Sequence, residues 1–173
     1  QQGGLLDVQW QDLPPSTSFS RKLDMKDGKA QMDVHFADGA LKTELVAAPY
    51  SDCIAYRMAC TLPKGCTVTL SLRHPDKKSE ITPTRDGWIL KGQGHNGGTR
   101  FENAVRVQAI DGRVSLDGGI LRIDNCKELL VLSSTKTDYN SRKPDSPLKN
   151  DLGTLNRNIL DAASRAGWKK LEQ

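Results

Sequence analysis

The segment DGRVSLDGGILRID, residues 111–124, holds two Asp-Gly pairs, each beside a short run in which apolar and polar residues alternate. Asp-Gly tolerates the positive φ angles of a tight hairpin turn at low cost. The runs at 113–116 and 120–123 have the two-residue period of strands with one buried face. The segment therefore predicts a reversal of the chain within an antiparallel sheet.

The same dipeptide recurs along the chain. It stands at Asp27-Gly28, Asp38-Gly39, Asp86-Gly87, Asp111-Gly112 and Asp117-Gly118. Each pair lies between short runs with the pattern of a strand, so these sites predict reversals in an antiparallel meander.

Alternation of apolar and polar residues is clear between the turns. In Thr67–Arg73, for example, three aliphatic residues alternate with threonine, serine and arginine. The segments with this pattern are 5–10, 19–25, 30–36, 41–47, 53–62, 67–73, 80–84, 88–91, 100–110, 113–116, 120–123 and 128–135. Eleven or twelve such strands cannot share one flat layer and predict a mainly β fold, an antiparallel two-sheet sandwich.

The pattern changes near the C-terminus. We expect a β-sandwich domain over 1–138, a polar linker with two prolines over 139–150, and an amphipathic helix over 151–173. In the last segment, apolar residues recur every three or four positions, as on one face of a helix. A lone helix must bury that face, either on the sheet of its own domain or on a neighbour outside this sequence.

Length and charge exclude several classes of protein. The 173 residues suit one domain, and no apolar run approaches the roughly 20 residues that span a bilayer, so no membrane insertion is expected. The net charge is +4, without a basic stripe interleaved with aromatic residues, so nucleic-acid binding is not expected. Gln1-Gln2 before two glycines suits either a mature end left after removal of a signal peptide or the cut end of a longer protein, and the first alternative predicts an exported protein, periplasmic or extracellular.

Four cysteines stand at Cys53, Cys60, Cys66 and Cys126. They form no Cys-x-x-Cys pair and have no histidine at ligand spacing, so we expect no metal site and no cofactor. An odd spacing places Cys53 and Cys60 on opposite faces of one strand. We interpret all four as buried thiols. Because Cys60 and Cys66 flank a turn, a disulfide between them stays open.

Several segments, in their order along the chain, also resemble a known family. They are 4–8, 19–24, 52–62, 68–75, the Gly-x-x-Phe-Glu strand at 98–102, the Asp-Gly-Gly hairpin at 116–121, 129–139 and 158–171. In this order they resemble the N-terminal β-sandwich domain of glycoside hydrolase family 95, which contains inverting α-L-fucosidases and α-L-galactosidases. The resemblance covers nearly the whole chain and rests on the order of loose motifs.

The resemblance implies an accessory role. In that family the general acid and the water-activating residues belong to an (α/α)₆ barrel that follows the sandwich, and nothing in this sequence aligns with them. The family's upstream Gly-Asn-Gly and Asn-x-Asp-x-Leu-Trp patterns are absent here as well. We therefore assign no catalytic residue to this chain, although the parent family is enzymatic. The implied partner is a catalytic barrel, or another protein surface, contacted through the C-terminal helix.

Four residues are candidates for contact with a carbohydrate. His74 ends a strand, and His95 lies in the Gly-rich loop at 92–98. Trp88 beside a turn and Tyr139 in the polar segment are aromatic residues that a sugar ring could stack on. Loops on a rigid scaffold commonly carry function, which favours such positions over strand interiors.

Two hypotheses follow. The first is a non-catalytic sandwich domain of a fucosidase-type glycoside hydrolase, which supports a catalytic barrel. The alternative is an independent exported module that binds carbohydrate, such as an oligosaccharide, or another protein. A hydrolase that is active on its own ranks last, because no pair of acids stands out from the turns and exposed strand faces.

Overall fold

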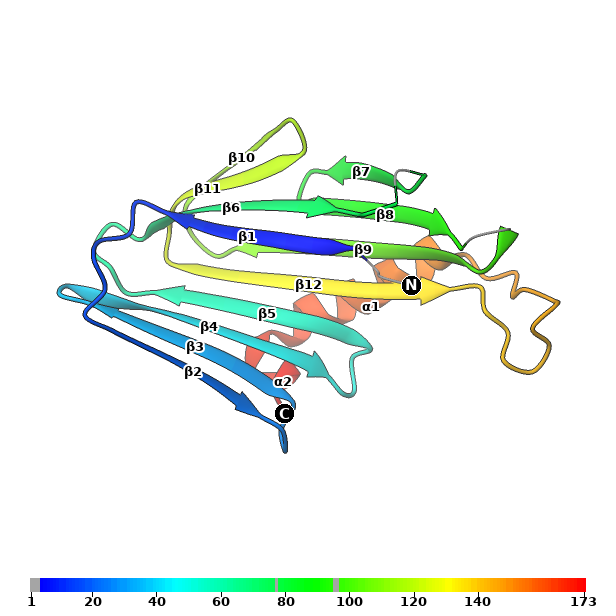
Figure 1. Cartoon of the computed structure of the whole chain (residues 1–173), viewed down its shortest axis with the longest axis horizontal. Helices are drawn as coiled ribbons and strands as arrows, with labels where there is room; N and C mark the ends of the chain where they lie inside the picture. Colours follow the sequence, from blue (N-terminus) through cyan, green and yellow to red (C-terminus); the bar gives the residue numbers. More distant parts are fainter. Residues whose placement is uncertain (1–3, 77, 95–96) are drawn as a thin grey trace.

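The computed structural model describes residues 4–76, 78–94 and 97–173. Within them the chain forms twelve strands followed by two helices (Figure 1). The strands are β1 (Leu5–Gln11), β2 (Ser18–Asp24), β3 (Lys29–Phe36), β4 (Gly39–Ala48), β5 (Cys53–Cys60), β6 (Cys66–Arg73), β7 (Glu80–Thr84), β8 (Gly87–Gln93), β9 (Arg100–Ala109), β10 (Arg113–Asp117), β11 (Ile120–Cys126) and β12 (Glu128–Thr137). The helices are α1 (Leu152–Ala166) and α2 (Trp168–Leu171).

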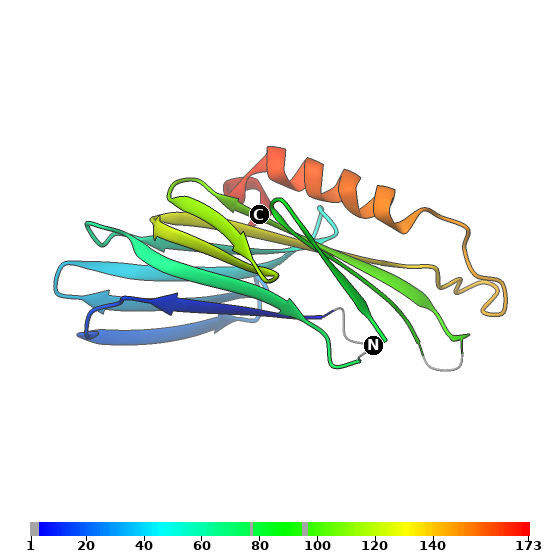
Figure 2. The same cartoon turned by 90° about the horizontal axis from the view of Figure 1, so that it is seen from above.

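The strands build two antiparallel sheets of unequal width. The smaller sheet has the order β1-β6-β11-β10, and the larger has the order β2-β3-β4-β5-β12-β9-β8-β7. The smaller sheet packs on one face of the larger, and the helices lie on the other (Figure 2). The prediction of a mainly β, two-sheet sandwich with a C-terminal helix is confirmed.

Four of the five Asp-Gly pairs occupy hairpins between neighbouring strands of one sheet, as predicted. The fifth prediction is wrong, because Asp111-Gly112 leads from β9 in the larger sheet to β10 in the smaller one. The Asp111 carboxylate accepts hydrogen bonds from the backbone N–H groups of Lys127 and Glu128, at 2.8 and 3.0 Å. These bonds hold the turn against the start of β12 and direct the chain out of the plane of the larger sheet.

The Gly-rich loop predicted at 92–98 begins later than expected. Gly92 and Gln93 are the last residues of β8, paired with Phe101 and Arg100 of β9. A Cβ atom at Gly92 would lie 2.4 Å from the Phe101 ring, so the strand needs glycine here to pack beside that ring.

Both faces of the larger sheet are buried along its centre. On β5, Met58 and Cys60 pack between the sheets, whereas Cys53 and Ala55 face the helices. Cys53 and Cys60 therefore lie on opposite faces of the strand, as predicted. All four cysteines are buried and free, so the structure contains no Cys60–Cys66 disulfide.

Helix α1 buries its apolar face on its own domain. Leu160 and Ala163 are 3% and 1% exposed and belong to an apolar cluster with residues of β4, β5, β9 and β12, and α1 itself lies over β12 and β9. Asp151 caps the first turn, and Gly167 (φ 70°) ends the helix before α2. The sequence allowed two surfaces on which the helix could bury its apolar face, and the structure shows the first of them, the sheet of the same domain. The apolar face of α1 is therefore occupied by its own domain, and contact of a partner with the rest of the helix stays a prediction.

Candidate interaction surface

The smaller sheet is only half as wide as the larger one and leaves part of it uncovered (Figure 1). The register aligns Leu23, Ala30, Leu45 and Tyr56 across β2, β3, β4 and β5, so their side chains point to one face. That face is the one on which the smaller sheet packs, because Tyr56 contacts the core between the sheets.

Large apolar side chains are exposed on this uncovered part. Leu23 is 65% exposed, Phe19 and Ile54 are each 51% exposed, and Leu45 is 42% exposed. Met32, which is half-buried, completes the group at the centre of β3. We call Phe19, Leu23, Met32, Leu45 and Ile54 the bare face. Contiguous apolar surface of this kind commonly marks a contact with another protein surface.

A cavity of about 550 Å³ adjoins the bare face, where β1 and β6 of the smaller sheet stand over the larger sheet. Leu45 and Ile54 of the bare face also line this cavity. Two pairs of polar side chains at this cavity are engaged: Ser133 Oγ donates to Asn103 Oδ1 at 2.9 Å, and Asp7 binds Arg73 at 2.5 Å. The cavity is therefore mainly apolar and continues the bare face inward.

Two half-buried aromatic residues, Tyr56 and Trp10, lie where the smaller sheet ends over the larger one. Burial raises the pKa of the Tyr56 phenol. Neither the Tyr56 hydroxyl nor the Trp10 indole N–H has a hydrogen-bond partner, although both are buried. Tyr56 and Trp10 lie against each other at this boundary, so their polar groups face one another without a hydrogen bond of good geometry.

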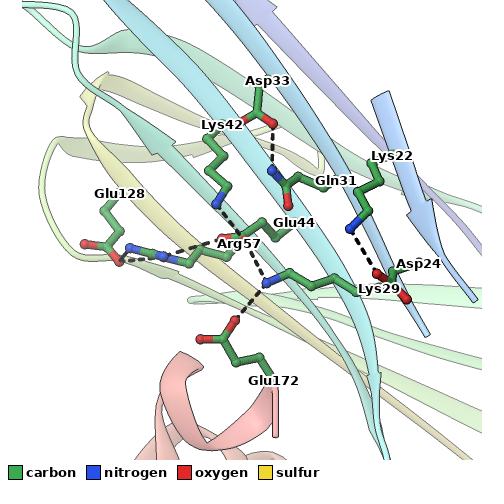
Figure 3. A network of polar contacts seen from close by, with 10 residues as sticks. All are labelled: Lys22, Asp24, Lys29, Gln31, Asp33, Lys42, Glu44, Arg57, Glu128 and Glu172. Carbon is green, nitrogen blue, oxygen red and sulfur yellow. Dashed lines mark hydrogen bonds and ion pairs between the residues drawn. The ribbon is translucent and has the colours of Figure 1, made fainter. Parts of the chain in front are cut away.

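The opposite face of the same strands is charged (Figure 3). Glu44 is only 4% exposed and lies within 2.7 Å of Lys29, 3.1 Å of Lys42 and 3.5 Å of Arg57. Burial raises the pKa of Glu44, but the two ammonium groups outweigh it and hold the pKa below its ordinary value. Lys29 also binds Glu172 at 2.8 Å. This network anchors the C-terminal end of the chain to the sheet.

The candidate carbohydrate contacts lie in different environments. Trp88 is 1% exposed, and its Nε1 donates to the Gly119 carbonyl at 2.9 Å, so its ring packs in the core and presents no face to solvent. His74 is half-buried, with its ring centroid 5.6 Å from that of Phe101. Tyr139 is 53% exposed. His95 lies outside the described residues.

The fold brings two of these candidates to one end of the sandwich. Phe101, which stacks near His74, pairs with Thr137 at the end of β12, two residues before Tyr139. Their contact with a sugar stays a prediction. Sequence reasoning missed the bare face, because alternation shows that a strand has an apolar side and not whether that side is covered.

Among the described residues, no group of three or more His, Cys, Asp and Glu side chains is arranged to hold a metal ion. None of the described helices has the length and apolar character needed to cross a bilayer.

Comparison with known proteins gives two findings. The family model described as "Glycosyl hydrolase family 65, N-terminal domain" matches residues 1–142. A solved structure described as "Putative kojibiose phosphorylase from human microbiome" superposes with a TM-score of 0.57 at 11% identity, over 96% of this chain and 26% of that chain. At that identity the likeness shows the fold alone. A search of curated proteins gave no match.

These findings support the glycoside hydrolase part of the sequence-based prediction, but they point to family 65 and do not show family 95. Since the family model covers most of the sequence, the chain belongs to the glycosyl hydrolase family 65 N-terminal domains.

Proposed function

We propose that this chain is the non-catalytic N-terminal domain of a glycoside-processing enzyme and that it packs against the catalytic domain through the bare face. The observation that carries the proposal is the exposure of Leu23, Phe19, Ile54 and Leu45 on a sheet face whose other half is core. Family membership supports a catalytic domain as the occupant. The similar solved structure is also much longer, since this chain covers 26% of it.

The bare face is large enough to matter energetically. Its four most exposed side chains present roughly 400 Å² of apolar surface, a typical size for a functional patch. At about 25 cal/mol per Å², covering it gives up to about 10 kcal/mol before the costs of association. Those costs are smaller between domains of one polypeptide, because the tether supplies a high effective concentration.

The charge of the bare face restricts its partner. Arg21 is the central residue of β2 on this face, between Phe19 and Leu23, and its guanidinium carbon lies 5.0 Å from the centroid of the Phe19 ring. A complementary surface would thus be apolar, with one carboxylate near Arg21.

The 550 Å³ cavity beside the bare face lacks the paired acids of a glycosidase site. Glycosidases place two carboxyl groups across the scissile bond, about 5–9.5 Å apart. Among the residues that line the 550 Å³ cavity, Asp7 is the one acid, and it is paired with Arg73. This supports an accessory role.

For the parent enzyme we propose hydrolysis of α-L-fucosides, on the strength of the ordered motif resemblance. The competing activity is phosphorolysis of kojibiose, suggested by the name of the similar solved structure. We also propose that the protein is exported. An assay of the complete gene product with both substrates distinguishes the two activities. Release of fucose from a fluorogenic fucoside supports the proposal. Phosphate-dependent cleavage of kojibiose without fucoside turnover contradicts it.

The docking proposal is tested with the chain and the catalytic domain of the same gene, produced separately and mixed. Leu23→Gln and Ile54→Gln place polar groups on the bare face and should each weaken association at least about tenfold, the effect of losing one well-buried apolar contact. Lys22→Gln changes the neighbouring position on the opposite face of β2 and serves as the matched control.

Association is measured by sedimentation velocity or calorimetry. Unchanged affinity of the double variant Leu23→Gln/Ile54→Gln would sink the docking proposal. So would a complete gene that encodes no catalytic domain after Gln173.

A further inference from the structure

A second cleft lies on the helix side of the larger sheet, away from the bare face. It has a volume of about 360 Å³ and runs between the first turns of α1 and strands β7, β8 and β9. A second hollow of about 290 Å³ adjoins it and shares Lys91, Glu102, Asp151 and Gly153. Figure 2 shows α1 running above this end of the sheet. The size is within the range of small-molecule sites, about 300–1,000 Å³.

The carboxylate of Glu102 is the central polar group of this cleft. The Glu102 side chain is 8% exposed and lines both hollows. Its partner is Lys91, whose Nζ lies 3.8 Å away, beyond hydrogen-bond distance, and no side chain or backbone N–H among the described residues donates a hydrogen bond to it. The Glu102 side chain borders both open hollows and its oxygens can accept further hydrogen bonds, so Glu102 favours a ligand that brings hydroxyl donors.

Glycine at position 153 keeps the space above this carboxylate open. A Cβ atom at Gly153 would lie 3.2 and 3.5 Å from the two carboxylate oxygens of Glu102. Gly153 is the second residue of α1, and alanine at this position would crowd the Glu102 carboxylate.

The position of Glu102 is fixed by the helix. Asn156 is completely buried, and its Nδ2 donates to the backbone carbonyl of Glu102 at 2.9 Å. This bond joins the second turn of α1 to β9. The carboxylate therefore stands on two rigid elements, which is the arrangement expected of a built site.

The charges around the cleft are balanced. Its acids are Asp86, Glu102 and Asp151, its bases are Lys91, Arg106 and Arg157, and its apolar lining includes Ile89, Ala104 and Leu160. Arg106 is engaged with Asp161 at 2.7 Å, whereas Arg157 is exposed and interacts electrostatically with Asp151 at the start of the helix. A simple anion would meet the Glu102 carboxylate, and a simple cation would meet the bases.

The geometry points to a binding site for a neutral carbohydrate, a mono- or disaccharide, in this cleft, with Glu102 accepting hydrogen bonds from sugar hydroxyls and Arg157 and Lys91 donating to them. Sugar hydroxyls both donate and accept, which suits alternating acids and bases, and the C–H face of a pyranose suits the apolar lining. The site stands on the side of the sheet opposite the bare face and does not depend on the docking proposed above.

The test is a titration of the ¹⁵N-labelled chain with L-fucose, D-glucose and kojibiose, followed by NMR. Binding should shift the amide signals of Lys91, Glu102, Gly153 and Arg157. Arg157→Ala, an exposed substitution, should weaken binding about tenfold, the effect of one lost charge-assisted hydrogen bond. Arg165→Ala, on an exposed position of the same helix, should leave it unchanged.

Two further variants keep the result interpretable. Gly153→Ala narrows the cleft and should abolish binding while the spectrum remains that of a folded protein. Leu23→Gln on the bare face should not affect it, which separates failure of this site from failure of docking. The proposal is overturned if none of the three sugars shifts these signals, if inorganic phosphate shifts them and the sugars do not, or if Arg157→Ala binds as tightly as the unchanged chain.

Discussion

The docking of α1 on its own sheet can be tested by one substitution with a matched control. Leu160 is 3% exposed and belongs to the apolar cluster that includes Ala104, Leu130 and Leu132, whereas Leu155 on the same helix is 37% exposed. Leu→Ala in a core costs about 2–5 kcal/mol. The site lies beneath one helix layer and can partly collapse, so we expect the lower part of that range, about 2–3 kcal/mol, for Leu160→Ala. For Leu155→Ala we expect less than about 1 kcal/mol.

Unfolding in urea, analysed by linear extrapolation, measures these free energies directly. A second readout is local. Cys53 is 7% exposed beneath the helices, whereas the other three thiols lie between the sheets. Burial raises the pKa of the Cys53 thiol, so labelling of the native protein should be slow.

Loosening of the helix in Leu160→Ala should speed labelling of Cys53 by about thirtyfold, the equivalent of 2 kcal/mol in the opening equilibrium. The other three cysteines should remain protected, as peptide mass spectrometry can show. The reasoning is refuted if Leu160→Ala and Leu155→Ala are equally stable, or if all four thiols become reactive together.

Three more predictions concern polar groups. Lys29 helps hold the pKa of Glu44 below its ordinary 4.5, so the ionised Glu44 stabilises the folded protein. Its contribution to the free energy of unfolding should be complete above about pH 4.5 and should be lost as the pH falls through the lower pKa of the folded state. In Glu44→Gln, urea titrations at several pH values should show a smaller loss of stability at acid pH. Asp138 is 2% exposed and accepts two hydrogen bonds from Arg100, both 2.8 Å, so Asp138→Ala should lower the free energy of unfolding by about 1–3 kcal/mol, and an unchanged urea midpoint would contradict this. Trp88→Phe loses a buried indole hydrogen bond and ring volume, and calorimetry should show a melting temperature several degrees lower, since about 1–2 kcal/mol is lost.

Strand positions could be predicted from the sequence because the strands alternate and because five of the connections between them carry an Asp-Gly pair. Alternation gave one apolar side per strand, and Asp-Gly pairs separated the strands, as at Asp86-Gly87 between β7 and β8. The failure at Asp111-Gly112 has a clear reason. The dipeptide specifies that the chain can turn, whereas two backbone N–H groups at the start of β12, remote in sequence, hold the turn between sheets.

The candidate sites were less predictable. Trp88 is next to a turn in the sequence, yet it lies in the core, because the smaller sheet covers that end of β8. The opposite error applies to Ile54, which shares a face with core residues of β5 and is 51% exposed. Neighbours along a strand can differ in burial when the covering sheet ends between them.

The sequence alone established that this protein has antiparallel strands, short turns and one amphipathic C-terminal helix. These features follow from the spacing of apolar residues and from the turn preferences of Asp-Gly, which act over only a few residues. Only the tertiary structure decided where the smaller sheet ends, which apolar face stays bare, and that Glu102 of β9 meets Gly153 of α1. Those features depend on contacts between residues far apart in the chain, and sheet width and helix placement are set by packing of the whole molecule.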